Sequence, residues 1–328
     1  MDVNETQLQK YTAVLILNYN NYEDTINCIE SVELYNTAPI KYIVVDNGST
    51  QEKAVKELDK YFSEKFADRY LYISDNYNQI HTLPYLTFLS SKSNDGYARG
   101  NNKGLELIYM FEEIEYVLIL NNDVLFVEDI LPFLLTKYKV LPNCGIISPI
   151  LYKKGLDELD YNCARLNATE WEIINVYMMW YRDIFGYISR SNNRRLILKR
   201  NIRRIDEEFI EIELPSGSCM LANKMLLRDI GGFDSNTFLY YEENILFKKL
   251  KKINRQNYLI PSQKCIHLGA SSTSKSNSVF IQRVGLNSAC YYLRNYCEMS
   301  IPQSFGLRIA LFSFNIKLWL KRICSRLR

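Results

Sequence analysis

Short apolar runs alternate with longer amphipathic stretches along the first part of the chain. Tyr11–Leu17 and Ile40–Val45 are almost entirely apolar, which is typical of strands buried on both faces of a sheet. Glu23–Tyr35 and Gln51–Phe66 instead repeat their apolar residues at the spacing of one helix face. Strand, helix, strand and helix in this order predict a parallel sheet with helices packed on its faces.

The alternation continues to about residue 270. We expect further strands at Tyr70–Ile73, Tyr85–Ser90, Tyr116–Leu120, Cys144–Ile150, Leu214–Leu221 and Tyr258–Ile260. We expect further helices from the glycine-rich stretch to about Phe111, at Glu128–Val140 and Lys224–Ile230, and after Asn244 to about Ile253. Residues 151–213 interrupt this pattern and are interpreted as an insertion over the sheet.

The apolar strand Tyr116–Leu120 runs directly into Asn121, Asn122 and Asp123. In open α/β folds, ligands bind at the carboxyl edge of the sheet, so the strand delivers Asp123 to that edge. A carboxylate there can bind a hard divalent cation, and the cation can neutralise a diphosphate. The alternative interpretation is an ordinary turn, since Asn and Asp favour turns.

A glycine-rich stretch, Asn94–Gly104, precedes the helix that ends near Phe111. Its glycines are four residues apart, so it matches neither the dinucleotide-binding fingerprint nor the P-loop. Glycine at a junction between loop and helix lets the backbone approach a ligand and exposes helix N-terminal amides to an anion. A flexible turn followed by a helix start is the alternative.

Two adjacent acids, Glu242 and Glu243, precede a predicted helix and follow an aromatic run. Such acids interact favourably with the positive end of a helix dipole. A carboxylate beside aromatic side chains also suits a general base, which must lie within hydrogen-bond reach of a hydroxyl. His267 is one of only two histidines and is either structural or a ligand.

The insertion contains a basic cluster, which is either a solvated face or a contact for lipid phosphate or an anionic acceptor. The cluster consists of Arg194, Arg195, Lys199, Arg200, Arg203 and Arg204.

The tail Ile301–Arg328 has no acidic residue. Its apolar helical face is formed by Ile309, Phe312, Ile316, Trp319, Leu320, Ile323 and Leu327. Its basic residues lie largely off that face and are Arg308, Lys317, Lys321, Arg322, Arg326 and Arg328. A basic amphipathic helix of this kind is typical of a membrane interface, and docking of its apolar face on the protein's own core is the alternative.

Composition excludes several classes of protein. Of the 328 residues, 47% are hydrophobic and 23% charged, as in ordinary globular proteins, and the net charge of +3 is too small for a general nucleic-acid binder. The eight cysteines form no CxxC pair and no Cys/His cluster, which argues against zinc and a disulfide framework and fits a reducing cytosol. No apolar run reaches the roughly 18–20 residues of a membrane-spanning helix. We therefore expect a cytoplasmic protein that binds the membrane peripherally.

Several motifs recur in an order that resembles a known family. They are Leu17–Asn20, Val45–Ser49, Asn94–Asn102, Leu120–Asp123, Gly217–Leu221, Gly231–Asp234 and Phe238–Glu243. Together they resemble the family 2 inverting glycosyltransferases of the GT-A fold, especially the bacterial, rhamnosyltransferase-like members that build capsule, O-antigen and other surface polysaccharides. The resemblance covers roughly residues 12–270.

The resemblance implies an α/β fold with a mostly parallel central sheet flanked by helices. Residues 1–270 would form the GT-A domain, with a nucleotide-sugar half at 11–125 and an acceptor half at 126–270. Residues 271–328 would form a C-terminal helical region. No GxGxxG motif follows the first strand, so a nicotinamide-dependent oxidoreductase is excluded.

The family's site residues map onto this sequence as follows. The nucleotide and donor sugar would be bound by Asn18, Asn20, Asp46, Asn47, Gly96, Arg99, Asn102, Asn122 and Asp123. Gly217 and Tyr241 would contact the acceptor. Asp123, at the family's Asp-x-Asp motif, and His267 would hold Mg²⁺ or Mn²⁺. Asn121 stands where that motif has its first acid, which weakens the metal site.

Glu243 matches the family's catalytic base, with Glu242 as the alternative. The implied activity is transfer of a sugar, with inversion, from a UDP- or dTDP-sugar to a glycan or lipid-linked glycan acceptor. An anionic membrane surface is the expected partner, and nucleic acid is not. The alternative is a non-catalytic nucleotide- or carbohydrate-binding protein on a degenerate GT-A scaffold, supported by the substitutions at Asn121 and Glu243.

Overall fold

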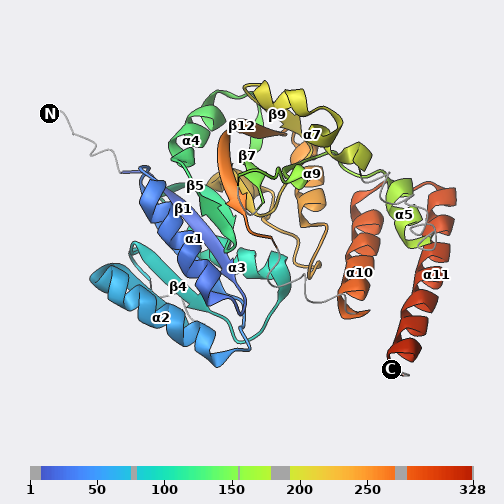
Figure 1. The fold of residues 1–328 in the computed structure, drawn as a ribbon, viewed down its shortest axis with the longest axis horizontal. Helices are drawn as coiled ribbons and strands as arrows, with labels where there is room; N and C mark the ends of the chain where they lie inside the picture. Colours follow the sequence, from blue (N-terminus) through green and yellow to red (C-terminus); the bar gives the residue numbers. More distant parts are fainter. Residues whose placement is uncertain (1–8, 75–79, 154–155, 179–192, 270–278, 327–328) are drawn as a thin grey trace.

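The computed structural model describes residues 9–74, 80–153, 156–178, 193–269 and 279–326, and a single large sheet dominates it (Figure 1). Its strands are β1 (Tyr11–Asn18), β2 (Ile40–Asp46), β3 (Tyr70–Ser74), β4 (Leu86–Ser90), β5 (Ile114–Asn121), β6 (Val124–Phe126), β7 (Cys144–Tyr152), β9 (Ile210–Ile212), β11 (Cys219–Asn223) and β12 (Gln256–His267). A separate two-stranded sheet pairs β8 (Ala164–Arg165) with β10 (Leu214–Pro215).

The order of the strands in the large sheet is β3-β4-β2-β1-β5-β11-β7-β12-β6, and β9 pairs with β12. From β3 to β5 every neighbouring pair is parallel. β11 then lies antiparallel between β5 and β7. The sheet is therefore parallel as far as β5, and the next strand, β11, runs in the opposite direction. The polar residues at the carboxyl end of β5 lie where the strand direction changes.

Helices cover both faces of the sheet, and a further group of helices lies beside it. They are α1 (Tyr22–Tyr35), α2 (Glu52–Phe66), α3 (Gly96–Tyr109), α4 (Ile130–Val140), α5 (Glu170–Met178), α7 (Ile197–Arg200), α8 (Lys224–Asp229), α9 (Glu242–Lys252), α10 (Val279–Tyr296) and α11 (Ile301–Arg326). Short 3-10 turns occur at η1 (Ala67–Arg69), η2 (Tyr161–Cys163) and η4 (Ile202–Asp206).

Two apolar cores sandwich the sheet because alternate residues of each strand face opposite sides. Val14 and Ile16 of β1 belong to the core under α1, α2 and α4, whereas Ala13 and Leu15 belong to the core under α3, α8 and α9. The continuous apolar runs predicted as buried strands are therefore buried on both faces. The fold class expected from the sequence, a mostly parallel α/β sheet flanked by helices, is confirmed.

A third core lies beside the sheet and joins segments far apart in the sequence. Buried residues of α5, from the insertion, pack with residues of α10 and α11, and Ile245 of α9 also belongs to this core. Figure 1 shows α5, α10 and α11 as one group next to α9. We call α5, α10 and α11 the helical unit.

Two sequence predictions need correction, and one strand was not anticipated. The strand predicted at Tyr258–Ile260 extends over Gln256–His267, so His267 lies on a strand and not in a following loop. The predicted strand Leu214–Leu221 is two strands, β10 and β11, separated by the turn around Gly217. β6 was not anticipated, because three residues carry too short a pattern to detect.

The tail forms a helix as predicted, but a different face of it packs on the protein. Leu307, Ala310, Phe314 and Leu318 are buried in the helical unit. The described members of the predicted apolar face, which include Phe312 and Trp319, are exposed. The side chains of Ile323 and Leu327 lie outside the described residues. None of the helices in the described part of the chain combines the length and the apolar character needed to cross a membrane.

Candidate functional site

A cavity of about 570 Å³ lies at the carboxyl ends of β1, β2 and β5. Residues following these strands line it together with the loop after β10 and the start of α9. Of the residues predicted from the sequence, the cavity brings together Asn47, Gly96, Asn122, Asp123, Gly217, Glu242, Glu243 and His267. We call it the first cavity.

Asp123, His267 and Asp160 form a chain of polar contacts on one wall. β6 and β12 pair antiparallel with His267 opposite Val124, which places the imidazole beside Asp123. His267 Nε2 lies 3.5 Å from Asp123 Oδ1, and His267 Nδ1 lies 3.3 Å from Asp160 Oδ2. Burial alone would lower the pKa of His267, but hydrogen bonds and charges of the two aspartates outweigh it and raise this pKa to about 9.

The pair Asp123 and His267 fits a divalent cation. The buried Asp123 Oδ1 has His267 Nε2 as its neighbour, at 3.5 Å. Two ligands bound about 2.1 Å from one ion lie roughly 3–3.5 Å apart, close to the observed separation. Asp160 would act as the carboxylate that orients a metal-binding histidine. In the described part of the chain, no cluster of three or more His, Cys, Asp or Glu residues is arranged around a metal position.

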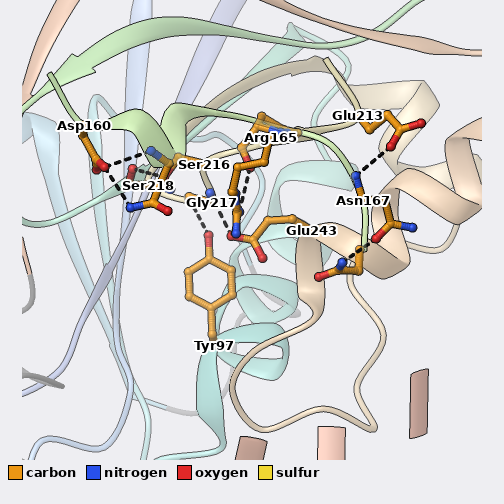
Figure 2. A network of polar contacts seen from close by, with 12 residues as sticks. Tyr97, Asp160, Arg165, Asn167, Glu213, Ser216, Gly217, Ser218 and Glu243 are labelled. Atoms are coloured by element: carbon orange, nitrogen blue, oxygen red, sulfur yellow. Dashed lines mark hydrogen bonds and ion pairs between the residues drawn. The ribbon is translucent and has the colours of Figure 1, made fainter. Parts of the chain in front are cut away.

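Glu243 also lines the first cavity and is held by the loop between β10 and β11. The backbone N–H of Gly217 donates a hydrogen bond to Glu243 Oε1 at 3.1 Å, and Tyr97 Oη donates to the Gly217 carbonyl at 2.6 Å. Arg165 approaches the same carboxylate oxygen at 3.5 Å. Figure 2 shows Tyr97 and Arg165 reaching Gly217 and Glu243 from opposite sides. The carboxylate is therefore fixed but still faces the cavity.

Glu242 has a different environment from its neighbour. It is 4% exposed, and its Oε1 has no hydrogen-bond partner among the described residues. Burial, followed by the negative charge of Glu243, raises the pKa of Glu242 to about 8. Glu242 is therefore mostly protonated at neutral pH and is a poor proton acceptor there. This favours Glu243 as the base.

The backbone before these acids is strained. Tyr240 and Tyr241 have φ angles of 74° and 72°, in the left-handed region that costs a side-chain-bearing residue about 1–2 kcal/mol. Contacts with the helical unit hold them there, since Tyr241 stacks on Tyr292 with ring centroids 5.5 Å apart. Ser288 Oγ also donates to the Leu239 carbonyl at 2.8 Å. Strain at a well-supported turn is a feature of functional sites.

Three predicted donor-binding residues lie behind the cavity wall. Asn18 Nδ2 donates to Asp46 Oδ1 at 2.7 Å, and the Ser49 N–H donates to Asp46 Oδ2 at 3.0 Å. Asn20 Oδ1 accepts from the Thr50 N–H at 2.8 Å, near the start of α2. These side chains shape the strand-end loops and do not line the first cavity. Their contact with a donor stays a prediction.

Arg99 and Asn102 on α3 also lie outside the cavity lining. Arg99 Nε donates to the Ser235 carbonyl at 2.7 Å. Asn102 donates from Nδ2 to the Phe233 carbonyl at 2.8 Å and accepts from the Phe233 N–H at 3.0 Å. In this structure they hold the loop that leads into Tyr240 and Glu242.

A second cavity, of about 500 Å³, adjoins the first, and Glu243 and Tyr240 line both. Tyr241, the predicted acceptor residue, lies here and not in the first cavity. Its other walls come from β8, the helical unit and Arg195. Sequence reasoning missed Asp160 and Arg165 as contributors to the site. Tyr97 lies in the glycine-rich stretch and Arg195 in the basic cluster, and both segments were singled out from the sequence, although neither residue was named as a site residue.

Known proteins provide an independent comparison. No protein-family model matches the chain. In sequence, it is 25% identical over 234 residues to the low-salt glycan biosynthesis hexosyltransferase Agl10 of Haloferax volcanii, covering 70% of this chain and 58% of that protein. It is 21% identical over 254 residues to the N-acetylglucosaminyl-diphospho-decaprenol L-rhamnosyltransferase of Mycobacterium tuberculosis, covering 75% of this chain and 72% of that protein. The chain thus spans little more than half of the first relative.

Solved structures show the same fold at low identity. GalNAc-T7, crystallised with UDP, GalNAc and Mn²⁺, matches with a TM-score of 0.61 at 10% identity and covers 88% of this chain and 48% of its own. The Pyrobaculum calidifontis mannosyltransferase PcManGT, in complex with GDP-Man and Mn²⁺, matches with a TM-score of 0.51 at 13% identity. The match covers 94% of this chain and 74% of the mannosyltransferase chain. The resemblance to glycosyltransferases is confirmed, and the fold is the GT-A fold.

Proposed function

We propose that this chain is a metal-dependent, inverting glycosyltransferase of family 2. The observation that carries the proposal is the first cavity, which a pair of metal-type ligands and a fixed carboxylate line together at the strand ends. Asp123 and His267 form the pair, and Glu243 is the carboxylate. Sequence relatives and structural neighbours that are glycosyltransferases support the same assignment.

Asp123 and His267 would hold Mg²⁺ or Mn²⁺. A bound cation would supply charge that stabilises the diphosphate of the leaving nucleotide. The two crystal structures named above contain Mn²⁺ with a nucleotide or a nucleotide sugar, which supports a divalent cation without separating the two metals. Asn122 anchors this wall, since its Nδ2 donates to the Asn21 carbonyl and to Thr25 Oγ1, both at 3.1 Å.

Glu243 would take the proton of the acceptor hydroxyl as its oxygen attacks the anomeric carbon. Its position between the two cavities lets one carboxylate face a donor in the first and an acceptor in the second. The hydrogen bond from the Gly217 N–H and the ion pair with the Arg165 guanidinium fix the direction of the carboxylate. Tyr97 also holds the Gly217 loop in place, through its hydrogen bond to the Gly217 carbonyl.

The donor would be a UDP- or dTDP-sugar, and the acceptor a glycan or a lipid-linked glycan of a surface polysaccharide such as capsule or O-antigen. Glycine at position 96 lets the start of α3 pack directly on the loop at Phe238, because a Cβ there would lie 2.1 Å from the Phe238 carbonyl oxygen. The names of the two sequence relatives, one acting in glycan biosynthesis and one on a diphospho-decaprenol glycan, are consistent with these substrates.

The protein would bind an anionic membrane from the cytoplasmic side through α11. A stripe of exposed apolar residues runs along this helix, formed by Phe305, Ile309, Phe312, Ile316, Trp319 and Leu320. Its spacing follows one helix face, and Arg308 and Lys317 lie beside it, as in interfacial helices. All seven described cysteines are free, which fits a reducing compartment.

A screen of nucleotide sugars for metal-dependent hydrolysis tests the proposal. Hydrolysis of one donor with Mg²⁺ or Mn²⁺, lost with a chelator, would support it, and the stereochemistry of the transferred sugar would test inversion. Metal-dependent binding of a nucleotide sugar without turnover, with any acceptor, would favour the non-catalytic alternative. Absence of both binding and turnover would contradict the proposal.

A further inference from the structure

Glu242 differs from Glu243 in the space that its side chain faces. Glu243 lines both cavities, whereas Glu242 lines the first cavity and not the second. In the proposed function, Asp123 and His267 hold the cation on the diphosphate, and Glu243 acts on the acceptor hydroxyl. The sugar of a bound donor would then lie in the first cavity, next to its own diphosphate. Glu242 is therefore placed to contact the donor rather than the acceptor.

One oxygen of the Glu242 carboxyl is engaged by the protein and the other is not. Glu242 is buried, and its carboxyl interacts with the backbone N–H groups of Tyr240 and Glu242 and with the side chain of Thr237. Oε1 has no hydrogen-bond partner among the described residues, so these contacts belong to Oε2. Oε2 thus supports the strained turn at Tyr240. Oε1 is an exception to the rule that buried polar atoms are hydrogen-bonded, and it belongs to a residue that lines a cavity.

The polar neighbours of Glu242 do not satisfy this atom. Tyr97 Oη donates a hydrogen bond to the Gly217 carbonyl at 2.6 Å. Glu243 Oε1 accepts from the Gly217 N–H at 3.1 Å and lies 3.5 Å from the Arg165 guanidinium. Neither Tyr97 nor Glu243 forms a hydrogen bond with Glu242 Oε1. A group bound in the first cavity would supply the missing partner.

The carboxyl of Glu242 is mostly uncharged at neutral pH, because burial and then the negative charge of Glu243 raise its pKa to about 8. Since Oε2 accepts from backbone N–H groups, the proton lies on Oε1, which becomes a hydrogen-bond donor. An uncharged donor can bind a hydroxyl oxygen without placing a second negative charge next to a diphosphate.

We propose that Glu242 recognises the donor sugar and that its Oε1 forms a hydrogen bond with a hydroxyl group of this sugar. A site that hydrogen-bonds a hydroxyl discriminates strongly against an analogue without it, because the polar group of the protein is then left unpaired. Glu242 would therefore select donors with a hydroxyl at one ring position over the corresponding deoxy sugars. The inference rests on the proposed function, because it assigns a determinant of the donor sugar in the same site.

Calorimetry with the full-length protein and Mn²⁺ tests the assignment. The probes are UDP-glucose and dTDP-glucose, each compared with its free nucleoside diphosphate, so that the ratio of the two affinities isolates the contribution of the sugar. Glu242→Met keeps the length of the side chain and removes both oxygens. We expect this variant to lower the ratio about tenfold, a typical effect of removing one partner of a hydrogen bond, while the free nucleotide binds normally.

Two variants serve as controls. In Glu242→Gln, the amide oxygen can replace Oε2 and the amide nitrogen can donate in place of Oε1, so the ratio should stay within about threefold of that of the unmodified protein. Thr237→Val removes a contact of Oε2 and leaves Oε1 unchanged, so it controls for effects on the turn. An unchanged ratio in Glu242→Met would overturn the assignment. So would an equal loss in Thr237→Val, which would attribute the effect to the turn.

Monodeoxy analogues of the nucleotide sugar that binds more tightly give a second test. One analogue should bind the unmodified protein about tenfold more weakly than the parent sugar, but should bind Glu242→Met as tightly as the parent does. If Glu242→Met does not fold, the unmodified protein decides. Equal affinity for the parent and every analogue would show that no sugar hydroxyl is recognised, and the assignment would be wrong.

The proposed function and the role of Glu242 fail in different ways. Asp123→Asn should lose metal-dependent binding of both the nucleotide and the nucleotide sugar, whereas Glu242→Met should lose only the contribution of the sugar. If neither nucleotide binds the unmodified protein with Mn²⁺, the proposed function fails and the role of Glu242 with it. If a nucleotide sugar binds and is hydrolysed, but Glu242→Met does not change its affinity, only the role of Glu242 is excluded. A sugar that adds no affinity over its free nucleotide in the unmodified protein excludes that role as well.

Discussion

The backbone N–H of Gly217 donates a hydrogen bond to Glu243 Oε1 over 3.1 Å, and this contact joins the turn after β10 to the first residues of α9. The same turn accepts a hydrogen bond from Tyr97 at the start of α3. Three elements distant in sequence therefore fix one carboxylate between two cavities. The arrangement makes Glu243, rather than its buried neighbour, the group whose removal should affect chemistry.

Glu243→Gln should lower the rate of transfer at saturating donor about 10²–10⁴-fold, the usual contribution of a general base. Glutamine keeps the shape of the side chain and can still accept the hydrogen bond from Gly217, but it cannot take a proton. Donor affinity, measured by calorimetry, should remain near normal, because the change affects the acceptor hydroxyl. Rapid transfer by this variant would exclude Glu243 as the base.

Asp123→Asn should abolish metal-dependent binding of the donor while leaving the fold intact. The substitution keeps the volume and removes the charge that a divalent cation requires. Calorimetric titration of UDP with and without Mn²⁺ measures the effect, and circular dichroism checks the fold. If the unmodified protein binds the nucleotide equally well with excess chelator, the metal assignment to Asp123 and His267 is wrong.

Glu242→Gln should change the pH dependence of stability. The folded-state pKa of about 8 lies above the ordinary glutamate pKa of 4.5, so the folded state retains a proton that the unfolded state releases. The unfolding free energy of the unmodified protein should therefore fall between about pH 4.5 and 8, at up to about 1.4 kcal/mol per pH unit from this group. The variant lacks this contribution, so its stability relative to the unmodified protein should rise across this window.

Urea unfolding at several pH values measures the Glu242 effect. Glu64→Gln on α2 is the control, because Glu64 is exposed and should give a difference that does not depend on pH. A difference for Glu242→Gln that is constant from pH 5 to 8 would show that the carboxyl of Glu242 is ionised in the folded protein.

Surface substitutions on α11 should release the protein from anionic vesicles. Deleting the helix would not be a clean test, because Phe314 and Leu318 are part of the core of the helical unit. The double change Phe312→Ser and Trp319→Ser removes exposed apolar area only, and should reduce co-sedimentation with vesicles of anionic lipid. Asn315→Ser, on the exposed side of the same helix, is the control. Equal sedimentation of all three proteins would leave α11 without a membrane role.

Gly96→Ala should destabilise the protein more than Gly231→Ala. Both glycines have positive φ angles, of 84° and 70°, so alanine is strained at either position, by about 1 kcal/mol. Only at Gly96 would the added Cβ also meet backbone, 2.1 Å from the Phe238 oxygen, whereas nothing lies within 4 Å at Gly231. We expect a loss of about 3 kcal/mol or more for Gly96→Ala by urea unfolding. Equal losses of stability in the two variants would mean that the loop at Phe238 can shift away from the added Cβ at little cost.

The sequence predicted the sheet and the two layers of helices well, because continuous apolar runs and helical spacing extend over whole elements. β1 and β2 begin at Tyr11 and Ile40, where they were predicted to begin. Short elements such as β6 and β8 were missed, since two or three residues carry no periodicity. The docking face of α11 was also missed, because this helix has two apolar faces and only the tertiary structure selects between them.

The site was predicted where a motif lies at a strand end. Asp123, Gly217 and Glu243 line one cavity because the start of α9 lies next to the carboxyl edge of the sheet. Asp160 and Arg165 were missed, since their roles come from contacts across more than fifty residues of sequence, which no local pattern records.

The shared core of α5 and α11 has a consequence for the order of folding during synthesis. Residues 179–300 lie between these helices, so α5 leaves the ribosome with its apolar face uncovered. At the usual elongation rate, this interval lasts on the order of ten seconds. Most strands of the sheet precede it and can pair early, whereas the wall of the second cavity closes only once α11 has been synthesised. A nascent chain arrested before α11 would therefore hold strand ends that line the first cavity but would lack a finished second cavity.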